Sequence, residues 1–124
     1  IHSDTARARG INNTPPQNET DALMRLVYLV LDPVRSQWGM PIRVNSGYRC
    51  PQLNKVVGGA STSQHMKGEA ADITAGSREK NKKLFELILT LNLPFDQLID
   101  EKNYSWIHIS HRKENNRRQV FHLK

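Results

Sequence analysis

The chain has 124 residues with a formal net charge of +6, and it contains one cysteine. This length fits one domain with a modest core, and a lone cysteine excludes an intrachain disulfide. The longest apolar run, near residues 26–31, is far shorter than the roughly 20 residues of a membrane-spanning helix, so we expect no membrane span. No signal peptide is visible at the start of the chain.

The N-terminal third of the chain predicts a polar lead-in followed by one long helix. Residues 1–20 are polar and contain two consecutive prolines, so we expect an extended segment. Residues 21–38 predict a helix, because apolar residues recur there at helical spacing. Pro33 is expected to kink or divide this helix, and Gly39 with Pro41 to end it.

The rest of the chain alternates between short strands and helices. Strands are expected at residues 42–44, 70–74, 95–99, 106–110 and 119–123. Helical segments are expected at 51–56 and 77–91, with Ser77 as the N-cap of the second. This order predicts a single α+β domain over residues 1–124, with helices packed on one small, mostly antiparallel sheet.

Two histidines and an aspartate form a candidate metal site. In a strand over 106–110, alternation turns His108 away from the core, and Asp72 can point outward from the neighbouring strand. His65 lies in a turn before that strand, where Gly68 lets the backbone bend back toward Asp72. Two imidazoles and one carboxylate suit zinc and leave the fourth position for water. The alternative is that all three are ordinary polar residues of loops and sheet.

Hydrolysis at such a site also needs a base and a group that anchors the substrate. Glu101 lies shortly before His108 and is the candidate base, with Asp100 as the adjacent competitor and Asp96 as a more distant one. Arg49 can bind a substrate carboxylate through its planar fork of donors. The alternatives are a solvated acid at Glu101 and a structural ion pair at Arg49.

Much of the excess positive charge lies near the start of the chain and in residues 111–118. A basic surface attracts anionic polymers such as nucleic acid or cell wall. We interpret residues 111–118 as a solvated loop rather than a dedicated binding patch. Because no nucleic-acid motif accompanies the charge, we expect no specific nucleic-acid partner.

Three segments together resemble the peptidase M15 family of zinc peptidases, which includes D-alanyl-D-alanine carboxypeptidases and phage endolysins. The resemblance covers most of the chain from about residue 42 to residue 110. The segments are Ser63-x-His65-x-x-Gly68-x-Ala70-x-Asp72, then Phe95-Asp-Gln-Leu-Ile99 with Trp106-Ile-His108-Ile-Ser110, and Ser46-Gly47-Tyr48-Arg49. The family fold is also that of the hedgehog signalling domain, which retains zinc.

The resemblance implies a role for each matching residue. The implied zinc ligands are His65, Asp72 and His108. Arg49 would bind the substrate or stabilise the oxyanion, and Glu101 would be the acidic base. Many family members place the acid closer to the last ligand, so the choice between Glu101 and Asp100 stays open. Further substrate contacts are expected from Ser63 and Trp106.

The expected function is therefore zinc-dependent hydrolysis of peptide bonds in peptidoglycan stem peptides. The bond is either the terminal D-Ala-D-Ala bond or an internal bond such as L-Ala-D-Glu. The alternative is a catalytically inactive zinc-binding recognition module of the same fold. Its expected place of action is the periplasm or cell wall, reached by export or by lysis of a phage-infected cell. A monomer is expected.

Overall fold

A computed structural model describes residues 4–124, and the α+β organisation expected from the sequence is confirmed. Its helices are α1 (Asp4–Arg9), α2 (Gln17–Leu26), α3 (Asp32–Trp38), α4 (Pro51–Val56) and α5 (Arg78–Thr90), with a π-helical turn η1 (Val27–Leu31) and a 3₁₀ turn η2 (Gln64–Lys67). Its strands are β1 (Arg43–Ser46), β2 (Ala70–Thr74), β3 (Gln97–Glu101), β4 (Trp106–Ser110) and β5 (Gln119–Leu123). None of the helices in this part of the chain is both long and apolar enough to cross a membrane.

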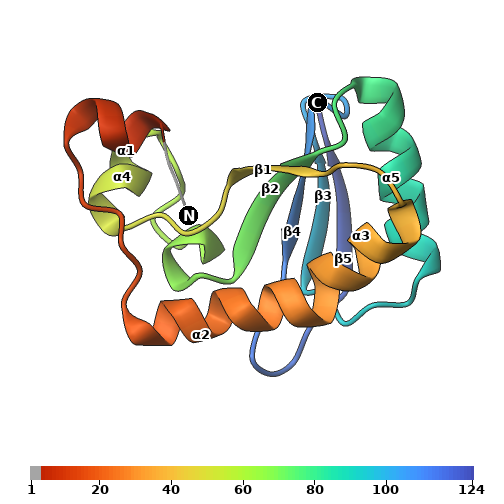
Figure 1. The fold of residues 1–124 in the computed structure, drawn as a ribbon, viewed down its shortest axis with the longest axis horizontal. Helices are drawn as coiled ribbons and strands as arrows, with labels where there is room; N and C mark the ends of the chain where they lie inside the picture. Colours follow the sequence, from red (N-terminus) through yellow and green to blue (C-terminus); the bar gives the residue numbers. More distant parts are fainter. Residues whose placement is uncertain (1–3) are drawn as a thin grey trace.

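The five strands form one sheet in the order β1-β2-β4-β3-β5. Neighbouring strands pair antiparallel except at one edge, where β5 runs parallel to β3. In Figure 1 the α2–α3 segment crosses the lower part of the view, α5 stands at one side of the sheet, and α1 with α4 lies at the other. The sheet therefore separates a helical core side from the region near α4 and η2.

The long helix continues through Pro33 instead of breaking there. The turn η1 directly precedes α3, and the N–H of Asp32 bonds to the carbonyl of Val27, five residues earlier. Proline lacks an N–H, and its ring crowds the preceding helical turn, so a wider π turn relieves the clash without ending the helix. Gly39, at φ 71°, then ends α3 as expected.

Within residues 4–20 the lead-in differs from the extended segment expected, and residues 1–3 of that expectation lie outside the described part of the chain. Helix α1 forms within the lead-in, and α2 begins at Gln17, four residues earlier than expected. The side chain of Asn13 donates to the carbonyl of Tyr48 at 2.9 Å and accepts from the N–H of Cys50 at 2.8 Å. These long-range bonds fix the segment against the loop before α4, which local composition does not predict.

The core lies between the sheet and the helices α2, α3 and α5. Strand alternation supplies its sheet side, with buried side chains from β2, β3 and β4 at Ala71, Ile73, Leu98, Ile107 and Ile109. The helices supply Leu26, Val30, Val34, Leu84, Phe85 and Ile88. The residues between these strand positions must face the opposite side of the sheet, where the candidate site lies.

Gly68 allows the η2 turn to pack against the start of α2. Its φ is +70°, and a Cβ placed there would overlap the carbonyl oxygen of Glu19. We expect Gly68→Ala to lower the free energy of unfolding by about 2–4 kcal/mol, from left-handed strain plus the clash. Urea denaturation checks this value. Gly39→Ala is the matched control, since Gly39 has a similar φ but no atom within 4 Å of the added Cβ. Equal losses in the two variants would contradict the packing argument.

Candidate metal centre

His65 is buried in the η2 turn and is held in one orientation. The side chain of Ser63 caps this turn by accepting from the N–H of His65, and Gly68 ends it in the left-handed conformation. The imidazole Nδ1 lies 2.7 Å from the carbonyl oxygen of Gly47, so Nδ1 carries the proton and donates it. Its Nε2 lone pair is then left facing Asp72.

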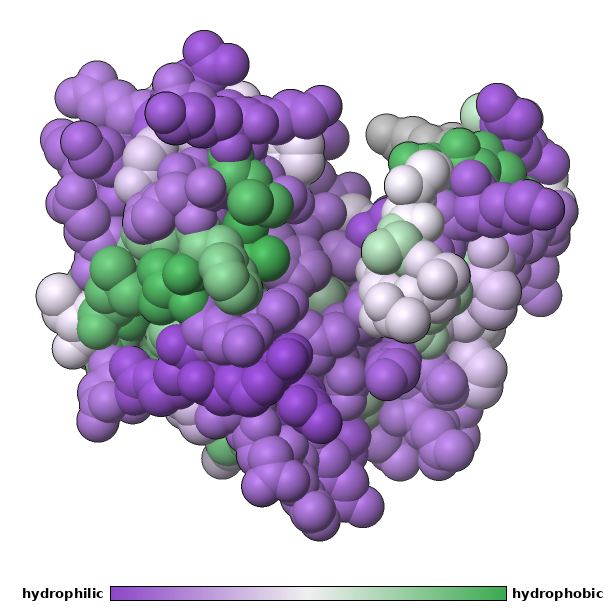
Figure 2. All heavy atoms as spheres, turned by 180° about the vertical axis from the view of Figure 1, so that it is seen from behind, coloured by the Kyte–Doolittle hydropathy of each residue, from purple (hydrophilic) through white to green (hydrophobic). Residues whose placement is uncertain are grey.

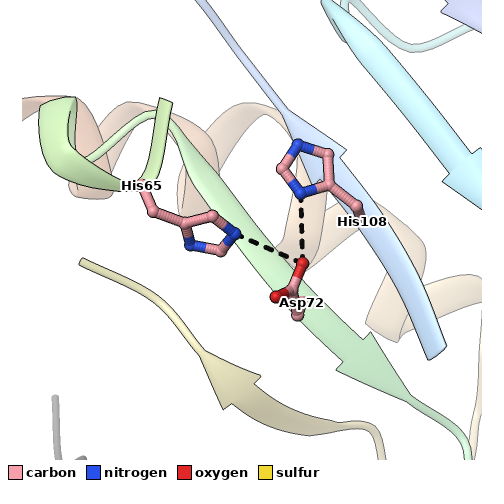
Figure 3. A group of neighbouring side chains, drawn as sticks. All are labelled: His65, Asp72 and His108. Atoms are coloured by element: carbon pink, nitrogen blue, oxygen red, sulfur yellow. Dashed lines mark hydrogen bonds and ion pairs between the residues drawn. The ribbon is translucent and has the colours of Figure 1, made fainter. Parts of the chain in front are cut away.

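Asp72 and His108 lie directly opposite each other on neighbouring antiparallel strands, β2 and β4. Figure 3 shows the rings of His65 and His108 converging on one carboxylate oxygen of Asp72. That oxygen, Oδ1, lies 3.3 Å from His65 Nε2 and 3.1 Å from His108 Nδ1. Burial alone would raise the pKa of Asp72, but hydrogen bonds and charge from the two imidazoles outweigh it and hold the pKa below its usual range.

These atoms fit a divalent metal on two grounds. First, the buried Nε2 of His65 carries no proton to donate, yet it faces a carboxylate oxygen of Asp72. Two electron-pair donors that face each other in this way are stabilised by a cation bound between them. Second, a tetrahedral zinc with ligand bonds of 2.0–2.1 Å separates its ligand atoms by about 3.3 Å, close to the spacings here. Within residues 4–124, His65, Asp72 and His108 form a group whose ligand atoms all lie within 4.8 Å of one another.

The three residues lie in an open cavity of about 600 Å³. One wall comes from the loop and turn between α4 and β2, and the other comes from the face of the sheet opposite the core. Figure 2, drawn from behind, shows a notch between these two parts of the molecule, in a largely hydrophilic surface. The lining residues include Arg49, Thr62, Ser63, Gln64, Gln97, Ile99, Glu101 and Arg117.

Strand alternation separates the candidate bases. Glu101 lines the cavity, and the indole N–H of Trp106 donates to its Oε2 at 3.1 Å. Asp100 is buried on the other side of β3, where it accepts from the N–H of Tyr104 and faces His122 at 3.2 Å. Of these two adjacent carboxylates, only Glu101 lines the cavity with the candidate ligands.

Asp96, the more distant competitor, is fully buried in an ion pair. Arg117 donates to it through Nε at 2.9 Å and Nη2 at 2.7 Å, and Gln64 adds a bond at 3.1 Å. Burial alone would raise the pKa of Asp96, but the bonds from Arg117 and Gln64 hold it below its usual range. Arg112 lies 4.0 Å from the same carboxylate. Residues 112 and 117 are therefore folded onto Asp96, which corrects the interpretation of 111–118 as a solvated loop.

Arg49 enters the cavity beside the candidate ligands. Its backbone N–H donates to the carbonyl of His65 at 2.9 Å, which joins residues 46–49 to the η2 turn. Burial lowers the pKa of its guanidinium, and the charges of Asp72 and Glu101 oppose that shift. It remains a protonated donor, because an arginine does not lose its proton in proteins. Ser63, also predicted as a substrate contact, lines the cavity as well.

Trp106, predicted as a substrate contact, is not among the residues that line the cavity. Its indole N–H is bonded to Glu101, and the ammonium of Lys102 lies 5.5 Å from its ring centroid. It orients the carboxylate from the neighbouring strand, β4. Sequence reasoning also missed Gln97 and Arg117. For Gln97 a signal existed, since it shares the alternation of Ile99 and Glu101 along β3.

Comparisons with known proteins agree with this site. The sequence pattern of a family described as Peptidase M15 matches residues 2–110. A segment of 38 residues is 58% identical to the zinc D-Ala-D-Ala carboxypeptidase of Streptomyces albus G. The match covers 31% of this chain and 15% of that protein, so it relates a segment and not the whole of either. Since the family pattern spans nearly the whole chain, the protein belongs to the peptidase M15 family.

Proposed function

We propose that this protein is a zinc-dependent peptidase that hydrolyses peptide bonds in peptidoglycan stem peptides. The observation that carries the proposal is the grouping of His65, Asp72 and His108 in one cavity with Glu101 and Arg49. Zinc bound there would act as a Lewis acid that acidifies a water molecule and polarises the substrate carbonyl. The family and the name of the Streptomyces relative support this choice of metal and substrate.

The side chains divide the chemistry between them. Glu101 accepts a proton as the water oxygen attacks the carbonyl carbon, and it returns that proton to the amine nitrogen as the C–N bond breaks. The bond from Trp106 keeps the carboxylate in place. Arg49 supplies fixed donors, either to the developing oxyanion or to a carboxylate of the substrate.

Two bonds of the stem peptide are candidates. A cation at Arg49 suits the free carboxylate of a terminal D-Ala-D-Ala, which favours carboxypeptidase action, while an internal L-Ala-D-Glu bond is the second choice. Digesting purified muropeptides with the zinc-loaded protein and weighing the products by mass spectrometry tests the proposal. Loss of D-Ala or release of a cut stem peptide supports it and names the bond. Intact muropeptides would instead favour a zinc-binding recognition module without turnover.

The role of Arg49 can be tested with Arg49→Gln. If Arg49 binds the terminal carboxylate, the variant should lose about 10–100-fold in kcat/KM, mainly through KM, because a charge-assisted hydrogen bond is lost. The loss should shrink when the substrate carries a C-terminal amide. Steady-state kinetics on the acid and amide pair measures both values.

Arg43→Gln is the matched control, because Arg43 lies exposed on the edge strand β1 outside the cavity lining. An equal loss on both substrates, carried by kcat, would assign Arg49 to the oxyanion instead. No change on either substrate would remove Arg49 from the mechanism.

The proposed substrate lies outside the cytoplasm. We therefore propose that the protein acts at the cell wall, reached by export or by cell lysis. Detecting the native protein in wall and culture fractions before and after lysis tests this location. A protein that is absent from the wall fraction both before and after lysis would contradict it.

A further inference from the structure

Arg117 is a second cationic side chain in the cavity lining, besides Arg49, and it lies near the end of β3 opposite to Glu101. Its side chain lines the cavity and is 44% exposed, so a ligand there can reach it. It lies in the connection from β4 to β5, beyond Ser110, where the match to the family pattern ends. The family match therefore does not cover this residue.

The guanidinium is held in one orientation by the protein. Its Nε and Nη2 form two bonds to the buried carboxylate of Asp96, and within residues 4–124 no bond engages Nη1. The loop beneath it is closed by Asn116, which bonds to both the N–H and the carbonyl of Arg112. Next along the chain, Arg118 lies 5.1 Å from the ring centroid of Phe95. A donor fixed in advance binds a ligand with little loss of side-chain entropy.

The position of Arg117 indicates which part of a substrate would reach it. His108 pairs with Ile99 on β3, and Gln97, which pairs with Gln119 of β5, lies two residues further along. That step is about 7 Å of strand, or about two residues of extended peptide. Arg117 lies two residues before Gln119 and lines the same cavity as Gln97. A substrate whose scissile carbonyl lies at the candidate ligands can thus place a neighbouring residue near Arg117.

We infer that Arg117 forms an anion subsite for a carboxylate that the stem peptide carries within a few residues of the scissile bond. This inference rests on the proposed function for its choice of substrate. The free α-carboxylate of γ-linked D-glutamate is such a group, and its amidated form, D-isoglutamine, is the neutral isostere. The subsite discriminates between wall peptides that differ only in this group.

The test compares a stem pentapeptide containing D-glutamate with the same peptide containing D-isoglutamine. Affinity is measured by calorimetry in the Glu101→Gln background, where the proposed base is removed, and cleavage is measured with the otherwise native protein. We expect the native side chain at 117 to favour the acid peptide about 5–10-fold, a preference that weakens with salt. Arg117→Gln should reduce the ratio to about one by weakening the acid peptide only.

Two further variants separate the effect of Arg117 on binding from effects on nearby charge and on folding. Arg112→Gln removes the other guanidinium near Asp96 but leaves the cavity lining unchanged, so it should retain the preference. Asp96→Asn with Arg117→Gln removes the buried charge together with its partner, which avoids leaving an unpaired carboxylate in the core. This double variant should also lose the preference for the acid peptide. Its thermal melting should remain cooperative, which shows that it is folded.

The possible results separate this inference from the proposed function. Discrimination in binding that depends on Arg117, without any cleavage, supports the subsite and contradicts the peptidase. Cleavage with equal affinity for both peptides, or a preference that survives Arg117→Gln, overturns the subsite and leaves the peptidase intact. Absence of binding to either peptide overturns the subsite as well.

Discussion

Asp72→Asn should abolish metal binding and hydrolysis together while leaving the fold in place. Asp72 is the residue on which both imidazoles converge, at 3.3 Å and 3.1 Å. The amide keeps the size of the side chain but loses the charge that a divalent ion requires. The loss of metal affinity should exceed the roughly 10–100-fold cost of removing an outer-shell partner. Competition against a zinc-chelating dye measures the affinity, and muropeptide digestion measures the activity.

Asp32→Asn is the matched control, since it makes the same change at an exposed position in the first turn of α3. Its affinity and activity should equal those of the native protein. Circular dichroism and thermal melting establish that both variants fold. A folded Asp72→Asn protein that binds zinc with native affinity would remove Asp72 from the ligand set.

Glu101→Gln should lower hydrolysis by about 10²–10⁴-fold, the contribution expected of a positioned general base. The amide can still accept the hydrogen bond from Trp106, so the side chain should stay in place. It cannot take a proton from water. Zinc content should remain unchanged, because Glu101 is outside the group of candidate ligands. Initial rates at saturating substrate and elemental analysis of the same sample check both expectations.

Glu114→Gln serves as the control, because Glu114 is exposed in the loop before β5 and does not line the cavity. It should be fully active. If Glu101→Gln keeps native activity, another group acts as base. Asp100 is then an unfavourable replacement, because it is buried behind the sheet and bonded to the backbone of Tyr104.

The candidate ligands were predictable because local rules place them. Alternation along β4 turns His108 away from the core occupied by Ile107 and Ile109, as expected from the sequence. Alternation along β2 does the same for Asp72, and Gly68 supplies the left-handed turn that returns His65 to it. Direct pairing of Asp72 with His108 then brings the three side chains together.

Other features depended on contacts between distant parts of the chain. The ion pair of Asp96 with Arg117 spans 21 residues, so a basic run at 111–118 looked like a solvated loop. The short helix α1 has a buried Ala6 in a polar sequence that predicts no helix by itself. Tertiary packing stabilises such short helices more than intrinsic propensity does.

The hydrogen bond that Trp106 makes was not predictable from the sequence, and the role of Trp106 as a substrate contact stays a prediction. Trp106 lies two residues from His108, which suggested contact with the substrate. In the structure its N–H is committed to Glu101, across the paired ends of β3 and β4. The identity of the cavity-facing acid likewise needed the register of β3, because Asp100 and Glu101 are adjacent and face opposite sides.

The central claim, a metal-dependent peptidase, is tested most directly by measuring bound metal and muropeptide cleavage on one preparation of the native protein. Elemental analysis and mass spectrometry are run before chelation, after chelation and after zinc is added back. We predict about one zinc per chain, as for a mononuclear catalytic site, with cleavage that disappears on chelation and returns with zinc. A folded protein that binds no zinc, or cleavage that continues at full rate after the metal is removed, would contradict the account.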